Sequence, residues 1–172
     1  MAKQADTILG MFLHNDLFAR DEIERNYDFY QEFTLHHSSL STCVFGIVAS
    51  LVGHDDEAYR YFSESVRLDL DDRHGNVYAG IHAANMAGAW QAVVFGFAGL
   101  RTNAGRLELS PRLPGQWGGY RFRVVYRGML LEVRVKKDAC SVRLLSGGSL
   151  DFTLYGKTCH ILKGEAICVS MK

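Results

Sequence analysis

Proline is scarce in this chain of 172 residues: it has only two, Pro111 and Pro114. Long apolar runs are absent too, because no stretch approaches the roughly 20 consecutive apolar residues that a membrane-spanning helix needs. A secretory signal is not expected, since the N-terminal stretch MAKQADTILGMFLHND contains Asp6 and lacks a small-residue cleavage pattern. These absences predict a cytoplasmic protein that does not associate with membranes.

Cysteine is present but is not arranged as metal ligands. The four cysteines, at positions 43, 140, 159 and 168, show neither CxxC nor CxC spacing, whereas a zinc site needs closer ligand pairs. Three of them fall on predicted strands and resemble small apolar residues. We therefore expect reduced thiols in the core, no metal ion and no cofactor.

A net charge is also lacking, but the two halves of the chain are oppositely charged. Residues 1–101 carry 7 Lys and Arg against 14 Asp and Glu, and residues 102–172 carry 12 against 5. Attraction between the halves, or an acidic partner, would explain this imbalance. A nucleic-acid surface on the basic half is the alternative. Because its arginines alternate with apolar residues, as exposed strand positions do, we expect no nucleic acid partner.

Apolar residues recur at helical spacing through the first hundred residues. Five helices are predicted, and the fifth, over about Ile81–Phe97, is apolar nearly all round, which is typical of a buried helix. Gly53 is expected to end the third helix and Asp55 to cap the fourth. The apolar faces of the first four are Ile8, Met11 and Phe12; Ile23, Tyr27 and Tyr30; Val44, Ile47, Val48 and Leu51; and Ala58, Tyr59, Phe62 and Val66. Few segments are available to bury these faces, so we expect further helices upstream.

After residue 101 the apolar period becomes two. YRFRVVYRG and LLEVRVKK alternate, and the further strands CSVRLL, DFTLY, TCHILK and AICVSM are separated by glycine-containing turns. Short strands at this spacing predict an antiparallel sandwich or barrel. The predicted fold class is thus α+β in two parts, with helices over residues 1–101 and strands over residues 102–172.

Two polar clusters precede predicted helices. In FTLHHSSLST, residues 33–42, Ser38 or Ser39 can cap the third helix. In GNVYAGIH, residues 75–82, Gly80 allows close backbone approach and His82 begins the fifth helix. Two converging helix starts with free amides and hydroxyls would bind an anion such as phosphate. Two ordinary capped helices, with histidines that are hydrogen-bonded within the protein, would produce the same pattern. The residues alone leave both interpretations open.

A set of motifs, taken in order, resembles one enzyme family. The set comprises KQAD at 3–6, YDFY at 27–30, SSLS at 38–41, MAG at 86–88, GLR at 99–101, PRLP at 111–114 and YRG at 126–128. Together they resemble the C-terminal part of the disaccharide phosphorylases of glycoside hydrolase family 65, which include maltose, trehalose and kojibiose phosphorylases. The resemblance implies that residues 1–101 are the final helices of an (α/α)6 barrel. It implies that residues 102–172 form a β-sandwich of the jelly-roll type.

The resemblance also implies roles for individual residues. Lys3 and Gln4 would contact the sugar, and Ser38, Ser39 and His82 would surround inorganic phosphate. Phosphate would be the co-substrate and would attack the anomeric carbon of an α-linked glucose disaccharide with inversion, releasing β-glucose 1-phosphate. The sequence departs from the family pattern at His37, where an acidic residue or glycine is common, and at Phe45, where histidine is common.

Cleavage of a glycosidic bond requires carboxyl groups, and this sequence lacks them at the positions that the family resemblance implies. An inverting hydrolase uses one carboxylic acid and one carboxylate base, and a phosphorylase replaces the base and its water with phosphate. No carboxylate lies between Thr34 and Cys43, which favours a phosphorylase over a hydrolase. The family's catalytic glutamate lies upstream of the Lys-Gln pair, so we expect no activity from this chain alone. A free-standing sugar- or phosphate-binding module is the alternative, and we expect a homo-oligomer or association with the missing N-terminal part.

Overall fold

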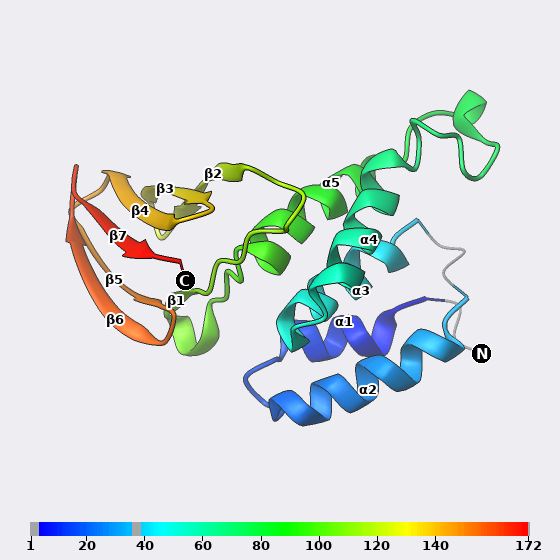
Figure 1. Ribbon diagram of the computed structural model, residues 1–172, viewed down its shortest axis with the longest axis horizontal. Helices are drawn as coiled ribbons and strands as arrows, with labels where there is room; N and C mark the ends of the chain where they lie inside the picture. Colours follow the sequence, from blue (N-terminus) through cyan, green and yellow to red (C-terminus); the bar gives the residue numbers. More distant parts are fainter. Residues whose placement is uncertain (1–3, 36–38, 172) are drawn as a thin grey trace. The chain divides into compact units, whose positions relative to one another are not determined.

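The computed structural model describes residues 4–35 and 39–171, drawn in colour in Figure 1. The chain forms two compact units, a helical unit over residues 1–96 and a sheet unit over residues 97–172. No helix among the described residues is long and apolar enough to cross a membrane.

The helical unit contains the five predicted helices within its described residues. They are α1 (Asp6–Leu13), α2 (Arg20–Phe33), α3 (Ser41–Val52), α4 (Asp55–Arg67) and α5 (Ala83–Gln91), with a short 3₁₀ turn, η1 (Val77–Ala79), between the last two. The fifth helix starts two residues later than predicted and changes at Ala92 into a π-helical segment, η2 (Ala92–Phe97). The Gly53 prediction is confirmed, because Gly53 ends α3 at φ 97°, a left-handed conformation that glycine adopts without steric cost.

The central helix of this unit is α3, not α5 (Figure 1). Nine of its twelve residues are buried, and it contacts α1, α2, α4 and α5. The prediction of a buried fifth helix is confirmed for η2, where Ala92, Val94 and Phe97 are buried, but is wrong for α5, where Met86 and Trp90 are 50% and 49% exposed. Only the edge of α5 that carries Asn85 and Gly88 is buried, because these residues face α3 and α4.

Two predictions about α4 need correction. Asp55 is the first helical residue and not the cap; the cap position belongs to His54, which makes no capping bond through its side chain. The buried face consists of Ala58, Tyr61 and Ser65, whereas Tyr59 and Phe62 are half-buried and Val66 is exposed. The face differs from the predicted one because Ser65 makes hydrogen bonds to Thr42 of α3 and Asn85 of α5, which turns its side of α4 inward.

The sheet unit contains two sheets. One has strand order β1-β5-β6 and the other β2-β3-β4-β7. The bounds are β1 (Leu107–Leu109), β2 (Gly119–Tyr126), β3 (Met129–Lys136), β4 (Ala139–Ser146), β5 (Ser149–Leu154), β6 (Lys157–Leu162) and β7 (Ala166–Ser170). The six predicted strands are confirmed as β2 to β7. The prediction missed β1, which has three residues and pairs with β5 in parallel. The pairs β2–β3, β3–β4, β4–β7 and β5–β6 are antiparallel.

The alternation predicted for β2 is present. Phe122 is buried while its neighbours Arg121 and Arg123 are exposed. Hairpin turns at Arg127-Gly128 and Tyr155-Gly156 have positive φ at both positions, the pattern of type I′ turns, which suit the twist of paired strands. One face of each sheet supplies the core of the unit, which includes Leu107, Leu109, Leu131, Val133, Val135, Val142, Leu144, Phe152, Leu154 and Ile161.

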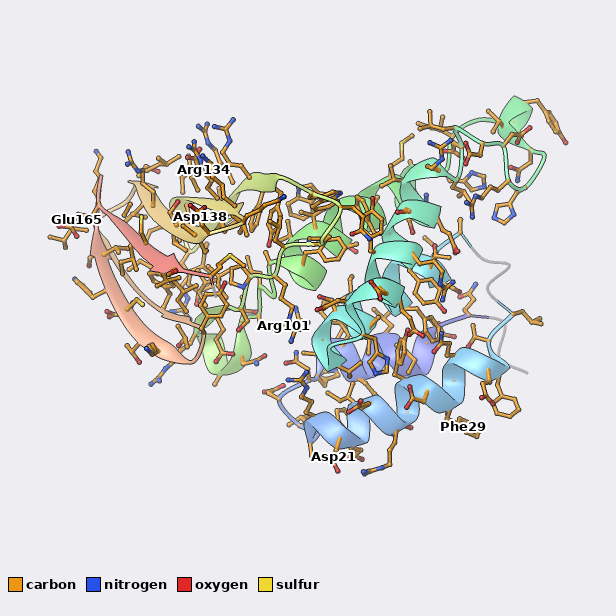
Figure 2. All side chains as sticks on the ribbon, in the orientation of Figure 1. Asp21, Phe29, Arg101, Arg134, Asp138 and Glu165 are labelled. Carbon is orange, nitrogen blue, oxygen red and sulfur yellow. The ribbon has the colours of Figure 1, made fainter. Side chains whose placement is uncertain are left out.

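Arg101, the arginine of the GLR motif and labelled in Figure 2, belongs to the sheet unit and is buried. Its backbone exchanges two hydrogen bonds with Glu108, at 3.0 and 2.9 Å. Its Nη1 donates to the Leu100 carbonyl at 2.8 Å. Burial lowers the pKa of Arg101 to about 10, although the nearby Glu108 carboxylate opposes this shift. We infer that Arg101 fixes the segment that enters β1.

All four cysteines are free thiols, but they are not all in the core. Cys43 and Cys140 are buried, as predicted. Cys159 is half-buried and Cys168 is exposed, so the prediction was wrong for Cys168. Cys168 lies on β7, the edge strand of its sheet, opposite Ser141 of β4. Residues of an edge strand on the outer face of a sheet are open to solvent.

Candidate functional site

The predicted site residues fall at three places in the helical unit. Gln4 is exposed in a bend just before α1, Ser39 is half-buried in the turn before α3, and His82 occupies the cap position of α5. Lys3 and Ser38 lie outside the described residues, as does His37. The capping role considered for Ser39 was wrong, because Leu40 occupies the cap position of α3 and no side chain makes a capping bond there.

The starts of α3 and α5 meet at the end of α4. The Thr42 and Ser65 hydroxyl oxygens are 2.8 Å apart, and the Asn85 side-chain amide donates to the Ser65 carbonyl at 2.7 Å. Ser65 and Asn85 are both buried. Further along α5, a Cβ at Gly88 would lie 2.5 Å from the Cys43 sulfur. The absence of a side chain at Gly88 therefore lets α5 lie close to the first turn of α3.

Two buried polar atoms at these helix starts have no hydrogen-bond partner in the part of the chain that the structure describes. They are the Ser41 hydroxyl oxygen in the first turn of α3 and the Asn85 side-chain carbonyl oxygen in the first turn of α5. Buried polar atoms are normally paired. The two atoms add hydrogen-bonding capacity to the region where the helix starts meet.

The loop from Leu68 to His82 carries the start of α5. Asp72 has a φ of 44°, and its Oδ1 accepts hydrogen bonds from the backbone N–H groups of Asn76 and Val77 at 2.9 and 3.1 Å. Aspartate tolerates this left-handed conformation because its short side chain can bond to the local backbone. These bonds hold the turn that leads through η1 and Gly80 to His82.

Asp69 is the main partner of His82. The Asp69 Oδ1 lies 2.6 Å from His82 Nδ1, and the Asp69 Oδ2 accepts the backbone N–H of His82 at 2.8 Å. These two bonds hold the pKa of Asp69 below its usual range, the backbone bond most strongly. The His74 ring lies 5.9 Å from the His82 ring, centroid to centroid. Both Asp69 oxygens thus contact His82, one at its ring and one at its backbone N–H.

Phe45 and Cys43, two further residues considered in the sequence analysis, are both buried in the core of the helical unit. Phe45, at a position where the family often has histidine, is fully buried between the rings of Tyr27 and Tyr61. Burial raises the pKa of the Cys43 thiol, which keeps this thiol in its neutral, unreactive form. Within residues 4–35 and 39–171, no group of three or more His, Cys, Asp or Glu side chains could hold a metal ion.

Sequence reasoning missed Asp69, Ser65 and Asn85. Asp69 belongs to the acidic run DLDD, in which nothing distinguishes it from Asp71 and Asp72. Ser65 and Asn85 interrupt apolar helix faces, and a polar residue on such a face was the one available signal. Their partners are 20 or more residues away, so local patterns could not identify them.

Comparison with known proteins gives consistent matches along the chain. Residues 1–91 match the glycosyl hydrolase family 65 central catalytic domain. Residues 100–161 match the glycosyl hydrolase family 65, C-terminal domain. The resemblance inferred from the sequence motifs is therefore confirmed over both parts of the chain.

Individual relatives are also similar. The chain is 46% identical to an alpha,alpha-trehalose phosphorylase of Geobacillus stearothermophilus, over 97% of this chain and 22% of the relative. It is 38% identical to a maltose phosphorylase of Bacillus subtilis (strain 168), over 89% of this chain and 20% of the relative. A solved structure titled "Putative kojibiose phosphorylase from human microbiome" matches with a TM-score of 0.92 and 34% identity, covering 99% of this chain and 25% of that one. The chain spans about a fifth of the length of the curated relatives, and it belongs to glycosyl hydrolase family 65.

Proposed function

We propose that this chain forms part of an inverting disaccharide phosphorylase that acts on α-glucosides. The relatives named above are trehalose and maltose phosphorylases, and the chain matches them over nearly its whole length. The observation that carries the proposal is the meeting of two helix starts, α3 beside Ser39 and α5 at His82, around Ser65. Free amides at helix starts favour bound anions, and phosphate is the anion that a phosphorylase consumes.

The proposed reaction follows from these parts. Phosphate, held by Ser39, His82 and the α3 and α5 amides, attacks the anomeric carbon from the face opposite the leaving sugar. The bond to the glycosidic oxygen breaks as a carboxylic acid protonates that oxygen, and β-glucose 1-phosphate and a free sugar leave. Ser38 would join the phosphate site, and Lys3 with Gln4 would contact the sugar. No cofactor takes part.

The protonating acid is proposed to lie outside these 172 residues. The chain spans 22% of its trehalose phosphorylase relative, so most of such an enzyme is contributed by other residues. The chain alone would then bind phosphate without catalysing turnover. We extend the proposal to assembly, with this chain joining either the remaining catalytic part or a second copy.

The hydrolase alternative requires a carboxylate base near the phosphate position. Asp69 contacts His82, but its two oxygens accept hydrogen bonds from Nδ1 and the backbone N–H of His82. Both contacts are consistent with a structural role in holding the start of α5. The segment between Thr34 and Cys43 contains no carboxylate that could serve as the base, which supports a phosphorylase over a hydrolase.

The proposed fold context explains several exposed apolar side chains. We propose that residues 1–101 are the last helices of an (α/α)6 barrel and residues 102–172 a jelly-roll β-sandwich. Phe29, labelled in Figure 2, Met86 and Trp90 are exposed apolar residues of α2 and α5. In a complete barrel, neighbouring helices would cover such residues.

Two measurements on the purified 172-residue chain test the proposal. Calorimetric titration with inorganic phosphate should show saturable binding, and sulfate should compete because it has the same shape. Incubation with phosphate and maltose, trehalose or kojibiose should release no glucose 1-phosphate. A flat phosphate titration would contradict the phosphate site, and turnover above blank would contradict the absence of the acid.

A further inference from the structure

We propose that Asp69 is a positioning residue for His82: it orients the imidazole ring and holds it doubly protonated when phosphate binds, so that Nε2–H donates to the anion. This inference rests on the proposed function, since it assumes that His82 faces phosphate. It assigns a role to a residue of the loop between α4 and α5 that the sequence did not distinguish.

The contacts of Asp69 fix the orientation of the His82 ring. Asp69 contacts His82 at two points, Nδ1 at 2.6 Å and the backbone N–H at 2.8 Å. One contact fixes the start of α5 and the other fixes the ring, so the ring cannot rotate without losing a short hydrogen bond. Nε2 lies on the opposite side of the ring from Nδ1 and therefore faces away from Asp69. The side chains of Asp69 and His82 are 11% and 24% exposed, so the ring keeps a side open to a ligand.

The Asp69 contact also determines which nitrogen of the His82 ring carries a proton. An ionised carboxylate can only accept, so Nδ1 must carry the proton of the Asp69 bond. A neutral ring then has a bare Nε2, which would repel a phosphate oxygen. A second proton, taken from solvent or from the phosphate monoanion, makes both ring nitrogens donors. The Asp69 carboxylate balances the resulting charge, and phosphate accepts the new hydrogen bond.

The other acidic residues near Asp69 have different partners and do not position the His82 ring. Among the described residues, the His74 ring also lies near the His82 ring, at 5.9 Å between centroids. Asp71 is paired with Arg67 at 2.6 Å, and Asp72 is occupied by the Asn76 and Val77 backbone. Asp69 is thus the acidic residue of this loop that contacts the His82 ring.

Phosphate titrations of three forms of the chain separate this role from a general charge effect. The forms are the wild type, Asp69→Asn and the matched control Asp72→Asn, which removes the same charge three residues away. Simple Coulomb repulsion between phosphate and the two carboxylates predicts that removing either negative charge tightens phosphate binding. The proposal predicts the opposite sign for Asp69→Asn, a weakening of about tenfold, because the lost interaction is a charge-assisted hydrogen bond. Asp69→Asn binding as tight as the wild type, or tighter, would overturn it.

Imidazole nitrogen NMR of His82 supplies a readout that a purely structural role would not change. Both ring nitrogens of the wild type should be protonated once phosphate is bound. In Asp69→Asn, the asparagine amide can donate to Nδ1, and the ring should become the neutral Nε2–H form. A neutral ring in the phosphate-bound wild type would overturn the inference, and this measurement remains valid even if Asp69→Asn fails to fold.

The same spectra distinguish failure of the phosphate site from failure of the role proposed for Asp69. If phosphate moves no resonance of Ser39 or His82 in the wild type, the proposed function fails and the role of Asp69 fails with it. If phosphate moves the Ser39 and His82 resonances equally in the wild type and Asp69→Asn, with equal affinity, the phosphate site stands and the inference about Asp69 is wrong.

Discussion

The Tyr27 hydroxyl donates a 2.6 Å hydrogen bond to Oε2 of Glu57 and thereby joins α2 to α4. Tyr27 is fully buried, and burial, followed by the Glu57 bond, raises its pKa well above the usual range. The His54 ring meets the Tyr27 ring edge-on at 5.5 Å, and its two nitrogens lie 3.3 Å from Glu24 and 3.5 Å from Glu57. This network fastens α2 to the corner between α3 and α4.

Replacing Tyr27 with phenylalanine should lower the free energy of unfolding by about 1–2 kcal/mol, because Glu57 loses a donor that water only partly replaces. Urea denaturation would measure the loss. Tyr78→Phe is the matched control and should change nothing, since Tyr78 is 91% exposed. Equal losses in the two variants would show that the Tyr27 hydroxyl contributes no specific bond.

Gly88→Ala should destabilise the helical unit by about 1–3 kcal/mol, the usual cost of overpacking. The new Cβ would lie 2.5 Å from the Cys43 sulfur and 2.8 Å from its Cβ, so α3 and α5 would have to separate. Gly10→Ala in α1 is the control, because nothing lies within 4 Å of a Cβ there. That change should stabilise by up to about 1 kcal/mol through helix propensity. A neutral Gly88→Ala would mean that α3 and α5 are packed less closely than described.

Glu132 lies between arginines on the outer face of the four-stranded sheet, which includes Arg134 (Figure 2). The Arg123 hydrogen bond at 3.1 Å, more than the nearby charges of Arg123, Arg121 and Arg134, lowers the pKa of Glu132 from 4.5. A lowered carboxyl pKa stabilises the folded state above the unfolded pKa, and this contribution is lost as the pH falls through the folded pKa.

Glu132→Gln should therefore lower the melting temperature at neutral pH and low salt. The difference from the wild type should shrink in high salt, which screens the exposed arginines, and it should vanish at a pH well below 4.5. Thermal melts across pH and salt would test this. Asp138→Asn, an equal charge change in the exposed β3–β4 turn, should have a smaller effect. If the two variants have the same melting temperatures at each pH and salt concentration, the effect is due to net charge and not to the contact between Glu132 and Arg123.

Ser39→Ala, made in a longer protein that contains this chain, should raise the KM for phosphate about tenfold while changing the KM for the disaccharide little. The reason is that the proposed hydroxyl contact is to phosphate alone. Initial rates with each substrate varied separately would measure both constants. Equal changes in the two would point to a structural role in the turn before α3.

Much of the fold followed from periodicity. The alternation of Phe122 with Arg121 and Arg123 identified β2 correctly, and the helical spacing around Ile47 identified α3. The errors arose where burial or strand pairing depends on tertiary packing. Apolar residues on α5 predicted complete burial, yet burial depends on which neighbours are present, and Trp90 remains exposed among the described residues. β1 was missed because three residues, Leu107–Leu109, are too few for a period, and its partner lies far along the chain.

The candidate site was less predictable. His82 could be singled out because a histidine at a helix start after a glycine is chemically distinctive. Asp69 could not, because its role depends on a loop that returns 13 residues later to bring His82 beside it. The hydrogen bond between Thr42 and Ser65 could not be predicted either, because it also joins residues far apart in the sequence. A sequence can indicate which side chains are chemically reactive. The partners that position those side chains depend on how the loops fold, which local patterns do not predict.

The parallel pairing of β1 with β5 has a consequence for biosynthesis. Leu107 pairs with Phe152, 45 positions later, so β1 emerges from the ribosome well before its partner exists. Leu107 and Leu109, both buried in the finished unit, must remain unpaired during that interval. Because non-local strand pairing is slow and leaves apolar strands open to aggregation, the sheet unit should complete its folding only after β5 has been translated. A nascent chain stalled between β1 and β5 would therefore be a natural client for chaperones.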